Sequence, residues 1–132
     1  MLDIMELAEK AVQTAHERDL IFDYSPESVS SLEKLAQMIY ETNKSQHLPE
    51  NVLWNAAVTY GVYLGETLLR NGLTELGFNW TEIEDGSMVL QRDRNWMSPI
   101  NKVYKRFING PEDNLEGFFE VSLALARGDI EL

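Results

Sequence analysis

Hydrophobic residues recur at intervals of three and four along the first half of the chain, as in helices that bury one face. Residues 2–17 begin the pattern, and a second helix follows the segment "SPES". Ser25 is expected to cap that helix, because its hydroxyl can accept a hydrogen bond from the free amides of the first turn. Pro26 suits the first helical position, where no amide donor is needed. A third helix is predicted over residues 50–71, with Gly72 supplying a left-handed end. The apolar residues that carry these patterns include Leu2, Met5, Ala8, Val12, Val29, Leu32, Leu35, Ile39, Val58, Leu64 and Leu68.

The spacing changes to alternation in "FNWTEIEDGSMVLQ", which predicts two antiparallel strands. The dipeptide "DG" at residues 85–86 favours a two-residue type I′ turn, because both central positions of that turn need positive φ. This turn would pair Ile83 with Met88 and Thr81 with Leu90 on one face. An isolated hairpin is marginal in water, so this hairpin is expected to lie on helices.

Two further helices are predicted after the hairpin. Ser98 and Pro99 repeat the cap-and-proline start, and the helix that they open ends at the "NG" of residues 109–110. The last helix spans residues 112–127 and is closed by Gly128. The predicted fold class is therefore α+β: a mainly helical single domain of about five helices, with one small β-hairpin packed on the helices.

The third predicted helix carries two glycines, which are poor helix formers. With a step of about 100° per residue, its apolar positions, Trp54 among them, span an arc of about 160°, and Gly61 and Gly65 lie side by side in the middle of it. An arc this wide suits a central helix with several neighbours. We expect another helix or the hairpin to approach these glycines closely. The alternative is a shallow groove that the glycines floor and that is open to a ligand.

Glu66 falls just outside that arc, on a polar strip with Asn55, Thr59 and Arg70. Arg70 follows it by four residues, which is the favourable order for an ion pair along a helix. One interpretation makes Glu66 a structural carboxylate that ties down a neighbouring loop and accepts a hydrogen bond from Trp80. The other interpretation makes it a site acid in a cleft.

The chain has 22 acidic and 11 basic residues, and its formal net charge is -11. A surface this acidic repels nucleic acid and anionic lipid, so neither is an expected partner. Residues 92–106 differ from the rest, because they hold five basic residues and a single acid. These cations are expected to pair with acidic helices of the same chain. Alternatively, they form a basic strip for an anionic ligand or partner.

The composition also bears on chemistry and location. The chain has no cysteine, and His16 and His47 lie on different predicted elements without the spacing of metal ligands. Neither a phosphate loop nor a G-x-S-x-G motif is present, so we expect a protein that is not an enzyme and has no metal or cofactor. The N-terminus has early acids and no basic leader, and no apolar run has the length of a membrane span. The cytoplasm is therefore the expected location.

The stretch "YGVYLGETLLRN", followed by Gly77 and Trp80, resembles a family of small bacterial domains of unknown function, whose members show a Y-hydrophobic-G-E motif and a tryptophan that opens a hairpin. "PINKVYKRFINGPEDNLEGFF" is similar to that family's closing block of a proline, K-V-x-K-R, N-G, an acid pair and a double aromatic. Where many relatives have G-G before the tryptophan, this chain has "LGFNW". The resemblance covers roughly residues 50–120 and implies a helical domain with a small sheet, without an activity. Some domains of this size and acidity occur beside bacterial toxins as immunity proteins.

Two functions from different classes follow from these observations. The first is a protein-interaction module whose acidic surface attracts a cationic partner, for example an immunity-type protein that masks a basic toxin. Its partner-facing parts would be the hairpin-tip acids Glu82, Glu84 and Asp85, with Tyr24 and Trp96 as exposed aromatics. The alternative is a binder of a small anionic ligand, in a cleft between the third helix and residues 102–106. The wall of that cleft would consist of Glu66, Arg70, Trp80, Lys102 and Arg106. A homo-oligomer is a third possibility.

Overall fold

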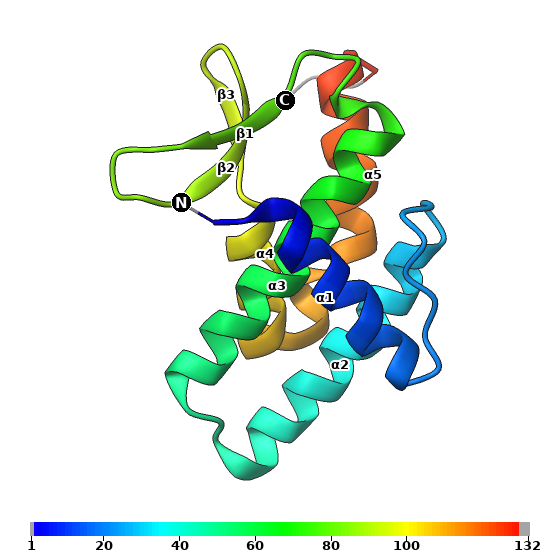
Figure 1. Ribbon diagram of the computed structural model, residues 1–132, viewed down its shortest axis with the longest axis vertical. Helices are drawn as coiled ribbons and strands as arrows, with labels where there is room; N and C mark the ends of the chain where they lie inside the picture. The colour runs from blue at the N-terminus through cyan, green and yellow to red at the C-terminus, as the bar shows by residue number, and fades with distance from the viewer. Residues whose placement is uncertain (1, 130–132) are drawn as a thin grey trace.

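The computed structural model describes residues 2–129 and confirms the predicted fold class, a mainly helical α+β fold (Figure 1). Helix α3 lies between α1 and α4, and a three-stranded antiparallel sheet packs at one end of the helices. The described residues form five α-helices, α1 (Ile4–Glu17), α2 (Ser28–Gln46), α3 (Glu50–Leu68), α4 (Pro99–Asn109) and α5 (Leu115–Arg127), a π-helical turn η1 (Leu69–Leu73), a 3-10 turn η2 (Gly110–Asp113), and the strands β1 (Asn79–Glu82), β2 (Met88–Arg92) and β3 (Asn95–Met97).

Side-chain caps define the starts of α1 and α4. The hydroxyl of Ser98 accepts a hydrogen bond from the amide of Asn101 at 3.2 Å, and Pro99 occupies the first helical position, as predicted. The carboxylate of Asp3 accepts a hydrogen bond from the amide of Glu6 at 3.0 Å. Both caps satisfy amides that have no partner inside the helix.

Helix α2 begins later than the segment "SPES" predicts. The hydroxyl of Ser25 accepts a hydrogen bond from the amide of Ser28 at 3.2 Å. The backbone bonds here join residues three apart, as in the 3.1 Å bond from the amide of Val29 to the carbonyl of Pro26. Residues 25–28 therefore form a tight turn, and the α-helix begins only at Ser28.

Glycines with positive φ mark the ends of three helices. Gly110 (φ +82) follows α4, and Gly128 (φ +79) follows α5, at the positions predicted. Gly72 has φ +147 and ψ -31 inside η1, so the chain leaves α3 through a π-turn and not through the predicted left-handed cap. A side chain at any of these positions would be strained, because residues other than glycine rarely adopt positive φ.

The hairpin of β1 and β2 forms where the alternation predicts it, but the predicted register is wrong by one residue. The prediction paired Thr81 with Leu90 and Ile83 with Met88. In the structure Leu90 lies opposite Trp80, and Met88 lies opposite Glu82. Because side chains alternate between the two faces of a strand, the shift places Trp80 on the face of Leu90. Leu90 is fully buried and Trp80 is half-buried.

The cause of the shift is the length of the loop. The amide of Gly86 donates to the carbonyl of Ile83 at 2.9 Å, and the amide of Ile83 donates to the carbonyl of Ser87 at 2.9 Å. Three residues, 84–86, therefore connect the strands, in the manner of a type I turn followed by a glycine of positive φ. Gly86 has φ +87, whereas Asp85 is not among the residues with positive φ, which a type I′ turn would require.

Strand β3 was not predicted. Asp93 and Arg94 form the two-residue connection from β2, and Trp96 then lies opposite Gln91. Asp93 has φ +54, a conformation that aspartate tolerates better than most residues. The connection contains neither glycine nor asparagine at its centre, so it lacks the usual sequence signal of a tight hairpin. The sheet order β1-β2-β3 leaves β3 at an edge.

The middle of α3 is more completely buried than its apolar arc predicts. Residues 59–69 are all buried, including two members of the predicted polar strip, Thr59 and Glu66. The connection between α1 and α2 covers this helix on one side, where the ring of Phe22 stacks on that of Tyr63 with centroids 4.4 Å apart. A sequence pattern alone does not show that a connecting segment will cover a helix.

The predicted close approach to the two glycines of α3 is confirmed. A Cβ added at Gly61 would lie 2.5 Å from the Cα of Ile100 in α4, and a Cβ added at Gly65 would lie 2.3 Å from Cζ2 of Trp80 in β1. A helix and the hairpin thus each pack on one glycine. The alternative, an open groove floored by the glycines, is wrong, because Ile100 and Trp80 occupy that space.

Candidate functional site

Two side chains contact the carboxylate of Glu66 where α3 meets the sheet. The indole N–H of Trp80 donates to Oε2 of Glu66 at 3.0 Å, and Nη2 of Arg70 lies 3.8 Å from Oε1. The side chain of Glu66 is only 12% exposed, whereas that of Arg70 is 44% exposed. An ion pair with so exposed a partner contributes at most about 1 kcal/mol. The hydrogen bond to Trp80, which attaches β1 to α3, is therefore the stronger constraint on this carboxylate.

Tyr24, predicted to be an exposed aromatic, is half-buried and held from several sides. Its amide donates to the hydroxyl of Tyr63 at 3.0 Å, and its carbonyl accepts from Nδ2 of Asn71 at 2.8 Å. The guanidinium of Arg70 lies 3.6 Å from the centre of the Tyr24 ring. Burial raises the pKa of the Tyr24 hydroxyl above its usual value. Tyr24 is thus part of the packing around α3.

Lys102 and Arg106, the predicted cations of the anion-binding cleft, both pair with acids of the same chain. Nε of Arg106 donates to Oε2 of Glu33 at 2.9 Å, and Nη2 donates to Oε1 of Gln37 at 2.7 Å. Nζ of Lys102 donates to Oδ1 of Asp113 at 3.1 Å. Arg106 is 3% exposed and has no free approach from solvent. This internal pairing counts against a clamp for an external anion.

The five residues of the predicted cleft therefore fall into two groups. Glu66, Arg70 and Trp80 contact one another where α3 meets β1. Lys102 and Arg106 project from α4 toward η2 and α2. Within residues 2–129 no hydrogen bond or ion pair joins the two groups, which argues against a single anion-binding cleft lined by all five.

The predicted acidic hairpin tip is exposed and lies beside a hollow of about 280 Å³. Asp85 lies at the rim, and Val58, Met88 and Ile100 supply apolar surface, while Trp54 forms a side wall. We call this hollow the acidic pocket; Leu2, Gly86, Ser87, Ser98 and Asn101 complete its lining. Glu82 and Glu84 are exposed on the same hairpin but do not line the pocket.

The carboxylate of Asp85 is fixed in place by the loop. The amide of Ser87 donates to Oδ1 of Asp85 at 2.9 Å. This bond, together with one from the Ser87 hydroxyl, holds the pKa of Asp85 below its usual value. The pocket rim therefore carries a negative charge at neutral pH. The hydrogen bond from the backbone of Ser87 holds that charge in position.

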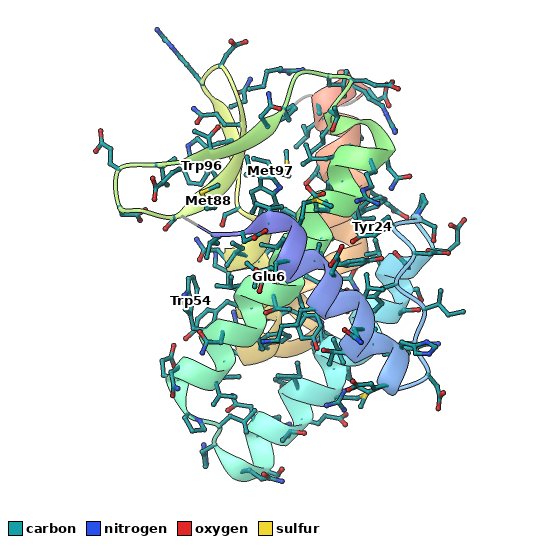
Figure 2. All side chains as sticks on the ribbon, viewed as in Figure 1. Glu6, Tyr24, Trp54, Met88, Trp96 and Met97 are labelled. Atoms are coloured by element: carbon teal, nitrogen blue, oxygen red, sulfur yellow. The ribbon has the colours of Figure 1, made fainter. Side chains whose placement is uncertain are left out.

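Trp54 is the functional candidate that the sequence did not single out. It belonged to the predicted apolar arc, yet it is 40% exposed and extends outward from α3 on the side of the hairpin tip (Figure 2). Its ring packs edge-on against that of Tyr104, with centroids 5.5 Å apart. The sequence held no signal for this exposure, because Trp54 falls within the apolar arc of the third predicted helix. Trp96, in contrast, is 54% exposed, in line with the prediction of an exposed aromatic.

Neither a cluster of metal-binding side chains nor a membrane-spanning helix is found among the described residues. Residues 2–129 contain no group of three or more histidine, aspartate or glutamate side chains placed to hold a metal ion. No helix within the same range is both long enough and apolar enough to cross a bilayer. His16 lies in α1, and His47 follows α2, so the two histidines come from different elements, as expected.

Comparison with known proteins gives no match: neither a family model, nor a curated protein, nor a solved structure matches this chain. The resemblance to small bacterial domains therefore stays a prediction.

Proposed function

We propose that this chain is a non-catalytic bacterial protein-interaction module, which binds a cationic segment of a partner protein at the acidic pocket. The observation that carries the proposal is the position of Asp85: its carboxylate is fixed at the rim of a partly apolar hollow, which the exposed Trp54 also lines. The cytoplasm, expected from the sequence, is the location that we assign to this interaction.

The pocket suits a single lysine or arginine side chain of the partner. Such a side chain has an apolar stem and a charged head, and the two parts prefer different surroundings. Met88 and Ile100 would contact the stem, while Asp85 would accept a hydrogen bond from the head. The face of Trp54 would add a cation–π contact, which is worth about 0.5–1 kcal/mol at an exposed site.

The charge around the pocket favours the same kind of partner. Residues 79–91 of the hairpin include three acids, Glu82, Glu84 and Asp85, and no lysine, arginine or histidine. The three acids of the hairpin tip are exposed. A field of one sign accelerates association with an oppositely charged partner and weakens in salt. An immunity-type protein that covers a basic surface of a toxin is one form of this proposal.

The proposal is tested by affinity pull-down from bacterial cytoplasm at low and at high salt. Wild type should retain one stoichiometric protein partner at low salt and lose it at high salt. The variant Glu82→Lys/Glu84→Lys, which reverses the charge of the tip, should lose the partner at low salt too. Trp54→Ala should weaken retention, because it removes the wall of the pocket.

A matched control separates the tip from the overall charge. Glu17→Lys/Glu75→Lys changes the net charge by the same amount at two other exposed positions. This variant should keep the partner at low salt. A partner that the tip variant retains as well as wild type does, or that resists high salt, would contradict the proposal.

A further inference from the structure

A larger hollow, which shares no residue with the acidic pocket, lies between the edge strand β3 and helix α5. Its volume is about 620 Å³, within the range of sites that hold small organic molecules. Phe78, Met97, Phe118 and Leu125 give it a mainly apolar lining. We call this hollow the β3–α5 groove. It differs from the acidic pocket in both size and charge.

The charge of the groove is opposite to that of the chain as a whole. Acids outnumber bases by 22 to 11 in the sequence, yet the groove lining includes two arginines, Arg92 and Arg94, and no acid. Asp93 and Glu120 lie next to lining residues in the sequence and are exposed, but they are not part of the lining. The groove is thus a local basic site with apolar walls.

Arg92 is held in a fixed position at the groove. Its Nη1 donates to the carbonyl of Leu76 at 3.0 Å, and its guanidinium lies 4.8 Å from the centre of the Phe78 ring. A guanidinium has five N–H donors, and this bond uses one of them. Within residues 2–129 no further partner is recorded for Arg92, and none for the exposed Arg94. Both arginines therefore retain donors that suit the two oxygens of a carboxylate.

The mouth of the groove exposes large apolar side chains. Trp96 is 54% exposed, and Val121 is 47% exposed. Trp96 and Met97 are neighbours on the edge strand (Figure 2). Both line the groove. Ser122, which is 6% exposed, adds a hydroxyl to the lining, and no hydrogen-bond partner is recorded for it in the described part of the chain. The groove thus combines apolar walls with two cations and a free hydroxyl. This combination suits a ligand that has both an apolar part and an anionic group.

We infer that the β3–α5 groove binds a small amphipathic carboxylate, meaning an alkyl chain or aromatic ring that ends in a carboxylate group. The apolar part fills the space among Phe78, Met97, Phe118 and Leu125. The carboxylate accepts hydrogen bonds from Arg94 and from the free donors of Arg92. The ligand carries the charge that complements the groove, and this sets it apart from the cationic partner of the acidic pocket.

The test uses the full chain and three ten-carbon probes in calorimetric titration: decanoate, decanol and decyltrimethylammonium. Decanoate should bind with a stoichiometry of one below its micelle concentration. The other two probes should bind at least about tenfold more weakly, since one charge-assisted hydrogen bond is worth about that factor. Decanoate should change tryptophan emission, and Trp96→Phe should remove most of that change.

Two variants with matched controls locate the site. Arg94→Gln should weaken decanoate binding about tenfold, whereas Arg18→Gln, at another exposed arginine, should leave it unchanged. Val121→Glu places a carboxylate at the mouth of the groove and should abolish binding, whereas Val52→Glu, at a similarly exposed valine, should not. Circular dichroism of each variant checks that it folds.

Three results would overturn the inference: no binding of decanoate, equal binding of the cationic probe, or equal binding by Arg94→Gln and wild type. The inference is independent of the proposed function. The Glu82→Lys/Glu84→Lys variant should bind decanoate as wild type does, so failure at one site is distinguishable from failure at the other.

Discussion

The ring of Trp80 occupies the space that a side chain at Gly65 would need. A Cβ built on Gly65 lies 2.3 Å from Cζ2 of Trp80 and 2.4 Å from Cη2. The sheet can rest on α3 at this point only because residue 65 has no side chain. Gly61 has the same relation to α4, where the nearest atom is the Cα of Ile100 at 2.5 Å.

Gly65→Ala and Gly61→Ala should both destabilise the fold, although alanine is the better helix former by about 1 kcal/mol. The added methyl group must displace Trp80 in one case and the backbone of α4 in the other, and overpacking of this kind costs about 1–3 kcal/mol or more. Gly61→Ala should cost more, because a backbone yields less readily than a ring. Urea unfolding measures both. Asn55→Ala, at an exposed position of α3, is the control and should not destabilise.

The bond between Trp80 and Glu66 should be visible in a double-mutant cycle. Glu66→Ala leaves the half-buried indole N–H without its acceptor and should cost about 1–3 kcal/mol of unfolding free energy. Trp80→Phe removes the donor and part of the ring. If the 3.0 Å bond stabilises the sheet on α3, the double variant should lose less than the two single losses added together. Strictly additive losses would show that the bond contributes nothing.

Removing one member of the ion pair of Glu33 and Arg106 should lower the free energy of unfolding. Glu33 accepts from Nε of Arg106 and from the amides of Leu115 and Glu116, so it joins α2 to α4 and caps α5. Glu33→Ala would leave a buried guanidinium without its charge partner and should cost about 3–5 kcal/mol. Nη1 of Arg106 already lacks a partner among the described residues.

Replacing both members of that pair supplies the control. Glu33→Met with Arg106→Met should recover part of the loss, because two apolar side chains carry no unpaired buried charge. Recovery should be incomplete, since the amides of α5 still lose their acceptor. Unfolding in urea measures wild type and both variants. A Glu33→Ala variant as stable as wild type would contradict the structure at this site.

The free energy of unfolding should decrease at acidic pH, because Asp113 becomes protonated there. A hydrogen bond from Asn109 at 2.8 Å, followed by that from Lys102, holds the pKa of Asp113 below its usual value. A carboxylate whose pKa is lowered by folding contributes its stability above the unfolded pKa and loses it as the pH falls through the folded pKa. Unfolding free energy should therefore decrease below about pH 4. Asp113→Asn should be less stable at neutral pH and should show a shallower decrease.

The loop of the β1–β2 hairpin offers a test of backbone conformation alone. A Cβ on Gly86 would meet nothing within 4 Å, but the residue has φ +87. Gly86→Ala should therefore cost about 1–2 kcal/mol through backbone strain and not through crowding. Gly86→Asn should cost less, because asparagine tolerates positive φ better. Equal stability of all three proteins would contradict the three-residue loop.

The sequence by itself determined the features that depend on neighbouring residues. The α4 start at Ser98 and Pro99, the ends at Gly110 and Gly128, and the presence of the first hairpin follow from capping and turn chemistry within a few positions. The two glycines of α3 indicated close packing for a similar reason, since a helix tolerates poor helix formers only where their small size is used.

Only the tertiary structure decided what depends on distant segments. One extra loop residue moved Trp80 onto the face of Leu90, and the segment carrying Phe22 buried the flank of α3. Arg106 pairs with Glu33, which lies 73 residues away in the sequence. The tertiary structure thus decided between internal pairing and an external ligand for this cation. Both surface hollows join residues from separate elements. Periodicity describes one element at a time, whereas burial and charge at these sites are set by the elements that pack against it.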